Sequence, residues 1–190
     1  MDISETIGIR IHGRGGQGAV TSAELIAQAA ISEGKYAQAF PSFGPERRGA
    51  PVQSFIRVNN QNPIRVRAEI LKPHVVVVLD PGLLNIINVA SGLKEGGALV
   101  VNTRGSIAET KEKFGGKHRV AVIDATIIAR QMLGVPIVNT TMIGALIKAT
   151  EIVKLESLFE PLNKRFGRLA EKNINAMKKA YEETLIEEEA

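Results

Sequence analysis

Gly13-Arg14-Gly15-Gly16-Gln17-Gly18 is the most informative segment of the chain. It follows the alternating apolar run of residues 7–12 and precedes an alanine-rich segment whose apolar residues recur every three or four positions. The first pattern predicts a strand and the second a helix, so the glycines form the turn between them. Such a turn leaves backbone N–H groups free at the positive end of the helix dipole, and glycine permits the positive φ values it needs. We therefore expect an anion site here; the plainer alternative is a tight turn without a ligand.

Strand and helix signals alternate along much of the chain. Three continuous apolar runs, typical of strands covered on both faces, lie at residues 75–79, 98–101 and 120–123. Helix start signals stand between them, with Asp80 before Pro81 and with Ser106 and Glu109 at capping-box spacing. This alternation predicts an α/β fold, a three-layer α/β/α domain with a mixed, mostly parallel sheet.

Antiparallel pairing is expected beside the parallel strands. Residues 36–40 predict a short strand. Residues 52–58 and 63–69 flank the polar connection 59–62, and this arrangement predicts one antiparallel hairpin.

The length of 190 residues, 44% of them hydrophobic, suits one well-cored domain over residues 1–190. Near its end, an apolar stripe on a charged segment predicts an amphipathic helix at about residues 168–186. That stripe covers either the domain's own core or a partner.

Composition excludes several kinds of site. The absence of Cys rules out disulfides, thiolate-bound iron–sulfur clusters and cysteine zinc sites, and the three His residues lack metal-ligand spacing. With no long apolar run and no signal peptide, we expect a cytoplasmic protein that does not bind a membrane. A net charge of +4 from dispersed basic residues, with 4% aromatic residues, argues against a nucleic-acid platform.

The glycine spacing also fits the fingerprint of NAD-binding proteins. Gly13, Gly15 and Gly18 match G-x-G-x-x-G. That fold also needs an acidic residue at the end of the second strand, and residues 36–42 contain none. The P-loop alternative lacks its Lys and Ser/Thr, because Ala19 and Val20 stand in their place. A stand-alone NAD(P)-dependent dehydrogenase is therefore the alternative function, and a nucleotide triphosphatase is disfavoured.

A loop rich in Pro and Gly, residues 40–51, follows the second strand. It is expected at the carboxyl edge of the sheet, where the glycine turn also lies. Arg47 and Arg48 in this loop can clamp a phosphate or carboxylate, or Glu46 can pair with one of them on the surface.

A third polar group, Asn139, Thr140 and Thr141, opens another helix. Its hydroxyl and amide groups either face the same crevice or, for one of the threonines, simply cap the helix.

Four motifs in one order resemble the gamma subunit of 2-oxoacid:ferredoxin oxidoreductases of the pyruvate synthase type. They are Gly-Arg-Gly-Gly-Gln-Gly (13–18), Phe-Pro-Ser-Phe-Gly-Pro-Glu-Arg-Arg-Gly-Ala-Pro (40–51), Val-Val-Val-Val-Leu-Asp-Pro (75–81) and Asn-Thr-Thr-Met-Ile-Gly-Ala (139–145). The resemblance covers nearly the whole chain and is less distinctive after about residue 155. It implies an enzyme that decarboxylates pyruvate or a related 2-oxoacid on thiamine diphosphate, transfers the acyl group to coenzyme A and passes electrons to ferredoxin.

The resemblance further implies a non-autonomous subunit that acts with alpha, beta and delta-type subunits. Thiamine diphosphate and iron–sulfur clusters lie on other subunits in that family, and no cofactor is expected on this chain alone. The chain would cover the active site and share coenzyme A, a co-substrate, with its partners. No residue is predicted to be catalytic or to bind a metal; the residues predicted to bind coenzyme A are Gly13, Arg14, Gly15, Gly16, Gln17, Gly18, Arg47, Arg48, Asn139, Thr140 and Thr141.

Overall fold

The continuous apolar runs form neighbouring parallel strands, as the sequence predicts. In the computed structural model, which describes residues 5–42, 49–114 and 118–187, every side chain of Val75–Val78 is buried. Helices cover such strands on both faces, which explains why their sequence lacks polar residues. The strands of the described residues are β1 (Ile7–Arg14), β2 (Tyr36–Pro41), β3 (Pro51–Asn59), β4 (Val75–Val78), β5 (Ala98–Asn102), β6 (Arg119–Ile123) and β7 (Leu185–Ile186).

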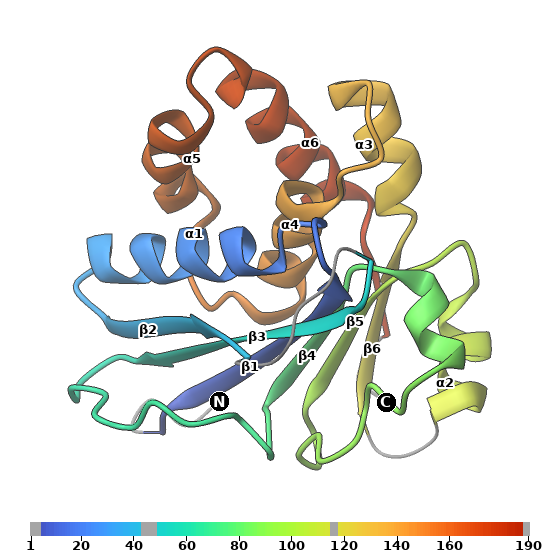
Figure 1. Ribbon diagram of the computed structural model, residues 1–190, viewed down its shortest axis with the longest axis horizontal. Coiled ribbons are helices and arrows are strands. Elements are labelled where there is room, and N and C mark those ends of the chain that lie inside the picture. The colour runs from blue at the N-terminus through green and yellow to red at the C-terminus, as the bar shows by residue number, and fades with distance from the viewer. Residues whose placement is uncertain (1–4, 43–48, 115–117, 188–190) are drawn as a thin grey trace.

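The strands lie in the order β2-β3-β1-β4-β5-β6-β7 (Figure 1). β1, β4, β5 and β6 are parallel neighbours. β3 is antiparallel to β1 and β2 is antiparallel to β3, so β2 runs in the same direction as β1. Only β3 and β7 among these strands run the other way. The predicted mixed and mostly parallel sheet is therefore confirmed.

The partner predicted for the antiparallel strand is wrong. Residues 63–69 form no strand, and β3 pairs instead with β2, which precedes it in the chain. Because β3 lies between β1 and β2, both of its edges are hydrogen-bonded. No edge of β3 is left for residues 63–69 to pair with.

Helices cover both faces of the sheet, which gives the expected three layers. Figure 1 shows α1, α3, α4, α5 and α6 on one face and α2 on the other. The predicted capping box of α2 forms, since Ser106 N donates to Glu109 Oε2 and Glu109 N donates to Ser106 Oγ. The helices are α1 (Ala19–Ser32), α2 (Ile107–Phe114), α3 (Ala125–Leu133), α4 (Asn139–Thr150), α5 (Phe159–Phe166) and α6 (Ala170–Glu183), with 3-10 turns η1 (Pro81–Asn85), η2 (Leu155–Leu158) and η3 (Gly167–Leu169).

The apolar stripe of α6 packs on the domain's own core. Of the two alternatives for this stripe, the domain's core and a partner, the structure shows the first. Ala170, Met177 and Ala180 are buried, and Met177 and Ala180 join the main core between the sheet and the helices. α6 crosses α4 so closely that a Cβ on Gly144 of α4 would overlap the carbonyl oxygen of Met177. A glycine at this crossing lets the two helix backbones approach each other.

Strand β1 carries two buried polar side chains on the face opposite its core isoleucines. Arg10 Nε donates to His12 Nε2 at 2.9 Å, and its Nη atoms donate to the carbonyls of Ile70, Val89 and Ser91. These bonds hold the loops after β3 and η1 against the sheet. His12 is buried next to this guanidinium, so desolvation and, second, the charge of Arg10 lower its pKa to about 4.

Acidification is expected to destabilise the fold through His12. An unfolded histidine titrates near pH 6.5, whereas the folded pKa of His12 is about 4, so the unfolded chain binds more protons between these values. The contribution of His12 to the free energy of unfolding therefore has its full value above about pH 6.5. It decreases by about 3 kcal/mol as the pH falls from about 6.5 to about 4. Urea unfolding at about pH 6.5 and about pH 5, where few carboxylates titrate, measures the upper part of this loss. The variant His12→Gln keeps an acceptor for Arg10 without titrating, and an equal pH dependence in both proteins would contradict the assignment.

Candidate functional site

The glycine turn lies at the carboxyl edge of the sheet, between β1 and α1. Gly16 and Gly18 have φ values of 95° and 80°, which confirms that the turn uses the left-handed conformations that glycine permits. Gly18 is also the N-cap residue of α1, and no side chain caps this helix. The N-terminus of α1 is therefore open to an external acceptor.

Two hydrogen bonds close the turn on itself. Gln17 N donates to Arg14 O at 3.0 Å, and Arg14 N donates to Gln17 Oε1 at 2.8 Å. The amide oxygen of Gln17 is thus occupied inside the turn. No hydrogen bond joins the N–H groups of Gly16 and Gly18 to any residue that the structure describes.

The described end of the loop before β3, residues 49 and 50, is hydrogen-bonded to the glycine turn. The loop was predicted to lie at this edge of the sheet. Gly15 N donates to Ala50 O at 2.9 Å and Gly49 N donates to Gly15 O at 3.1 Å, which extends the pairing of β1 and β3 by one step. Arg47 and Arg48 lie outside the described residues, so their contribution stays a prediction.

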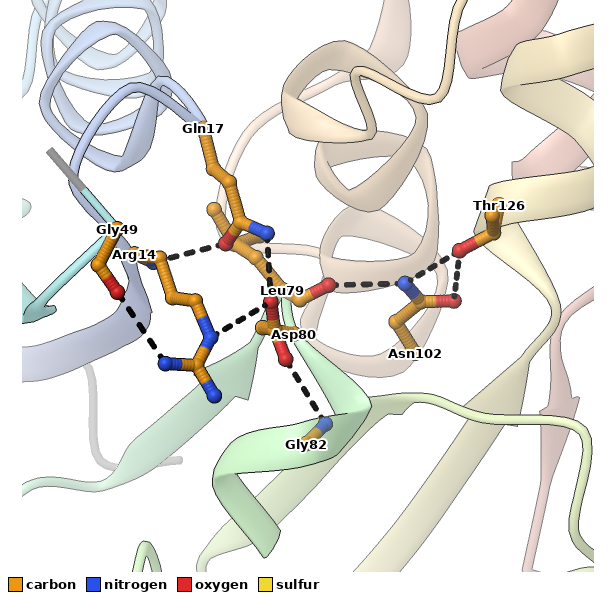
Figure 2. A network of polar contacts seen from close by, with 8 residues as sticks. All are labelled: Arg14, Gln17, Gly49, Leu79, Asp80, Gly82, Asn102 and Thr126. Atoms are coloured by element: carbon orange, nitrogen blue, oxygen red, sulfur yellow. Dashed lines mark hydrogen bonds and ion pairs between the residues drawn. The ribbon is translucent and has the colours of Figure 1, made fainter. Parts of the chain in front are cut away.

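Asp80, two residues after the end of β4, holds the turn from the other side (Figure 2). Its Oδ2 atom accepts from Arg14 Nε at 3.1 Å and from Gln17 Nε2 at 2.7 Å, while Oδ1 accepts from Gly82 N at 2.8 Å. Arg14 Nη1 also donates to Gly49 O at 3.2 Å. Asp80 is absent from the residues predicted for the site, because its position before Pro81 indicates only a helix cap.

A signal for Asp80 was nevertheless present in the sequence. It follows a buried parallel strand, and such strands end at the same edge as the glycine turn. At the next strand end, Asn102 Nδ2 donates to Leu79 O at 2.8 Å and lies 3.0 Å from Thr126 Oγ1 (Figure 2). Polar side chains thus connect the ends of β1, β4 and β5 with the start of α3.

Of the third predicted group, Asn139, Thr140 and Thr141, only Asn139 lies beside the glycine turn. Asn139 lies against the turn, since a Cβ on Gly18 would stand 2.6 Å from its Nδ2 atom. Thr140 is buried and its hydroxyl donates to Asn173 Oδ1 at 2.8 Å, and Thr141 is equally buried with no hydrogen-bond partner for its hydroxyl. Neither threonine caps α4, whose N-cap residue is Val138.

The topology argues against a dinucleotide-binding protein. In that fold the first two strands of the sequence are parallel neighbours joined by a helix, whereas here the antiparallel β3 separates β1 from β2. The acidic residue that follows α1, Glu33, pairs with Lys35 at 2.8 Å. Among the described residues no group of three or more His, Asp or Glu side chains is arranged to hold a metal ion.

Fold and site together define an α/β protein whose glycine turn has two N–H groups without a described acceptor, and which has neither a ribose-binding acid nor a P-loop lysine. The chain belongs to the pyruvate ferredoxin/flavodoxin oxidoreductase family, whose model matches residues 8–183. It is 53% identical to the Pyruvate/ketoisovalerate oxidoreductases common subunit gamma of Thermococcus litoralis, over 96% of this chain and 99% of that protein. It is 50% identical to the Pyruvate synthase subunit PorC of Methanothermobacter thermautotrophicus, over 93% and 95% of the two chains. The resemblance to gamma subunits is thereby confirmed.

Solved structures share the fold. The pyruvate oxidoreductase subunit PORC of Thermotoga maritima matches with a TM-score of 0.87 and 38% identity, over 97% of this chain and all of that one. The 2-oxoglutarate:ferredoxin oxidoreductase of Magnetococcus marinus, solved with 2-oxoglutarate, coenzyme A and succinyl-CoA bound, matches with a TM-score of 0.73 and 22% identity. That match covers 94% of this chain and 30% of the larger one. No helix among the described residues is long and apolar enough to span a membrane.

Proposed function

We propose that this chain is the gamma subunit of a multi-subunit 2-oxoacid:ferredoxin oxidoreductase and that its glycine turn holds phosphate groups of coenzyme A. The open N-terminus of α1 behind Gly16 and Gly18 carries the second part of the proposal. Free N–H groups at the positive end of a helix dipole bind anions, and coenzyme A brings several phosphates. Coenzyme A is also bound in the Magnetococcus marinus enzyme, which contains this fold.

The predicted residues contribute to this site in different ways. Gly16 and Gly18 supply the N–H groups, while Gly13, Gly15 and Gln17 shape the turn through hydrogen bonds of their own. Nη2 of Arg14, which makes no hydrogen bond to a described residue, supplies a charged donor. Asn139 borders the turn at Gly18. Thr140 and Thr141 act by fixing the start of α4, because their side chains are buried. Arg47 and Arg48 remain proposed ligands from the loop that adjoins Gly49.

The chain's part in the reaction is binding rather than chemistry. In this proposal the alpha, beta and delta-type subunits carry thiamine diphosphate and the iron–sulfur clusters, and the complex reduces ferredoxin in the cytoplasm. The lack of Cys in this chain supports that division, since thiolates are the usual cluster ligands. The gamma chain covers the active site and orients coenzyme A toward the acyl group formed there. Pyruvate and 2-oxoisovalerate are the substrates that the names of its relatives favour.

The variant Gly16→Ala tests the coenzyme A site in the complex reassembled from its subunits, with the isolated gamma chain as an inactive baseline. An added Cβ at Gly16 meets no atom of the described residues within 4 Å, so in this proposal it projects where the ligand approaches. We expect the KM for coenzyme A to rise about ten-fold, equivalent to one lost hydrogen bond, with kcat unchanged at saturation.

Gly134→Ala is the matched control, because Gly134 has a similar φ of 76° and an equally open surrounding but lies at the end of α3. It bears the same backbone strain and should leave the KM unchanged. Equal KM values in the two variants would refute the coenzyme A site. Oxidoreductase turnover by the isolated chain would refute the subunit role, and calorimetric binding of NADH or NADPH by that chain would favour the dehydrogenase alternative.

A further inference from the structure

We propose that Asp80 is a positioning residue for the coenzyme A-binding turn, an inference that rests on the proposed function. Its Oδ2 atom receives two donors of the turn, Arg14 Nε and Gln17 Nε2, although 66 and 63 positions separate these residues from Asp80 in the chain. Asp80 therefore fixes the turn to the end of β4 (Figure 2), and in this proposal it acts through Arg14 and Gln17 rather than on the ligand.

The two contacts determine which parts of the turn remain free for a ligand. With Nε on Asp80 and Nη1 on Gly49 O, the guanidinium of Arg14 is held in one orientation that leaves Nη2 available. Gln17, bound to Asp80 through Nε2 and to Arg14 N through Oε1, keeps its own side chain inside the turn. The N–H groups of Gly16 and Gly18 have no acceptor among the residues that the structure describes.

A carboxylate is required at this position, because one oxygen accepts from two donors while the other accepts from Gly82 N. An asparagine can satisfy Gly82 N, but its amide nitrogen would then face the donors of Arg14 and Gln17. The side chains of Arg14 and Asp80 are 29% and 17% exposed, so water replaces the lost contact only in part.

The chain contains a matched aspartate that lacks this connection. Asp124 follows β6 as Asp80 follows β4, its Oδ1 atom accepts from Ile127 N at the start of α3, and its Oδ2 atom pairs with Arg104 Nε at 3.1 Å. Asp124 therefore combines a cap with an arginine pair, as Asp80 does, but contacts no residue of the glycine turn.

Steady-state kinetics of the reassembled complex with Asp80→Asn and Asp124→Asn separates positioning from stability. We expect D80N to raise the KM for coenzyme A about ten-fold with kcat at saturation unchanged, because the turn loses its fixed geometry while the reacting atoms are untouched. D124N should leave the KM unchanged and lower the melting temperature less, because the side chain of its partner Arg104 is 81% exposed. A D80N complex with lowered stability and an unchanged KM would overturn the proposal.

Two further variants keep the test decisive if D80N assembles poorly. Gln17→Met removes the contact with Asp80 together with the bond from Arg14 N, without changing a charge, and it should raise the KM at least as much. The double variant D80N/Q17E exchanges the donor and the acceptor across the 2.7 Å contact, and part of the melting temperature lost in D80N should return. Its KM should stay raised, because the carboxylate at position 17 repels the phosphates of coenzyme A. An unchanged KM in Q17M, or no recovery of the melting temperature in the double variant, would overturn the role of Asp80.

Failure of the proposed function is recognised separately through Gly16→Ala. A raised KM in G16A with no effect of D80N and Q17M rejects Asp80 alone. No effect in G16A, D80N and Q17M rejects the coenzyme A site and the positioning role together.

Discussion

Gly144→Ala is expected to destabilise the protein by about 3 kcal/mol, although alanine is the better helix former. In an exposed helix the change would stabilise by about 1 kcal/mol. Here the new Cβ would overlap Met177 O and lie 3.0 Å from Tyr181 N, two backbone atoms within α6. Neither can move without displacing the helix, so α4 and α6 must separate and leave the core between them poorly packed. Thermal or urea unfolding of the purified chain measures this loss.

Gly34→Ala is the control for Gly144→Ala. Gly34 follows α1 with a φ of 79° and open space around it, so alanine there meets backbone strain but no neighbour. We expect a cost of about 1 kcal/mol for that variant. A Gly144→Ala protein as stable as the wild type would show that α4 and α6 do not cross at this distance.

Gly18→Ala is expected to have the second largest effect, a loss of about 3 kcal/mol together with a distorted glycine turn. The φ of 80° disfavours any side chain, and the added Cβ would stand 2.6 Å from Asn139 Nδ2. α1 and α4 would have to move apart at their N-termini. Urea unfolding reports the stability, and the KM for coenzyme A in the complex reports the turn.

The double variant Gly18→Ala with Asn139→Ala separates the two causes. Shortening Asn139 removes the contact with Nδ2 but leaves the positive φ, so about half of the lost stability should return. If the stability losses of the two single variants add in the double variant, Asn139 makes no steric contact with the new Cβ at position 18. The whole loss in Gly18→Ala would then come from the backbone conformation.

Local chemistry made most of the elements predictable. The apolar runs, the capping box of Ser106 and Glu109 and the glycines with positive φ each depend on residues within about one turn or one strand. The prediction was wrong for residues 63–69. Their sequence has a strand-like pattern, but β1 and β2 already pair with both edges of β3, the strand that they were expected to join. The alternation of apolar and polar residues does not reveal which edge is free.

The candidate site shows the same division. The glycine turn and its place before α1 follow from the residues that build it, whereas the fate of Thr140 depends on Asn173, 33 positions away on α6. The two threonines were predicted to face a crevice, but both are buried in the interior of the domain. A hydroxyl that opens a helix looks the same in sequence whether it faces solvent or another helix.

The alternation of strands and helices, the positive φ values at Gly16 and Gly18, and the motifs that place the chain in its family all follow from the amino-acid sequence alone. These features depend on side-chain pattern and on the conformations that individual residues permit. Only the tertiary structure decided that β3 separates β1 from β2 and that Asp80 meets Arg14 and Gln17. Those contacts join residues far apart in the chain, and they exist only because the packed sheet brings the ends of β1 and β4 to one edge.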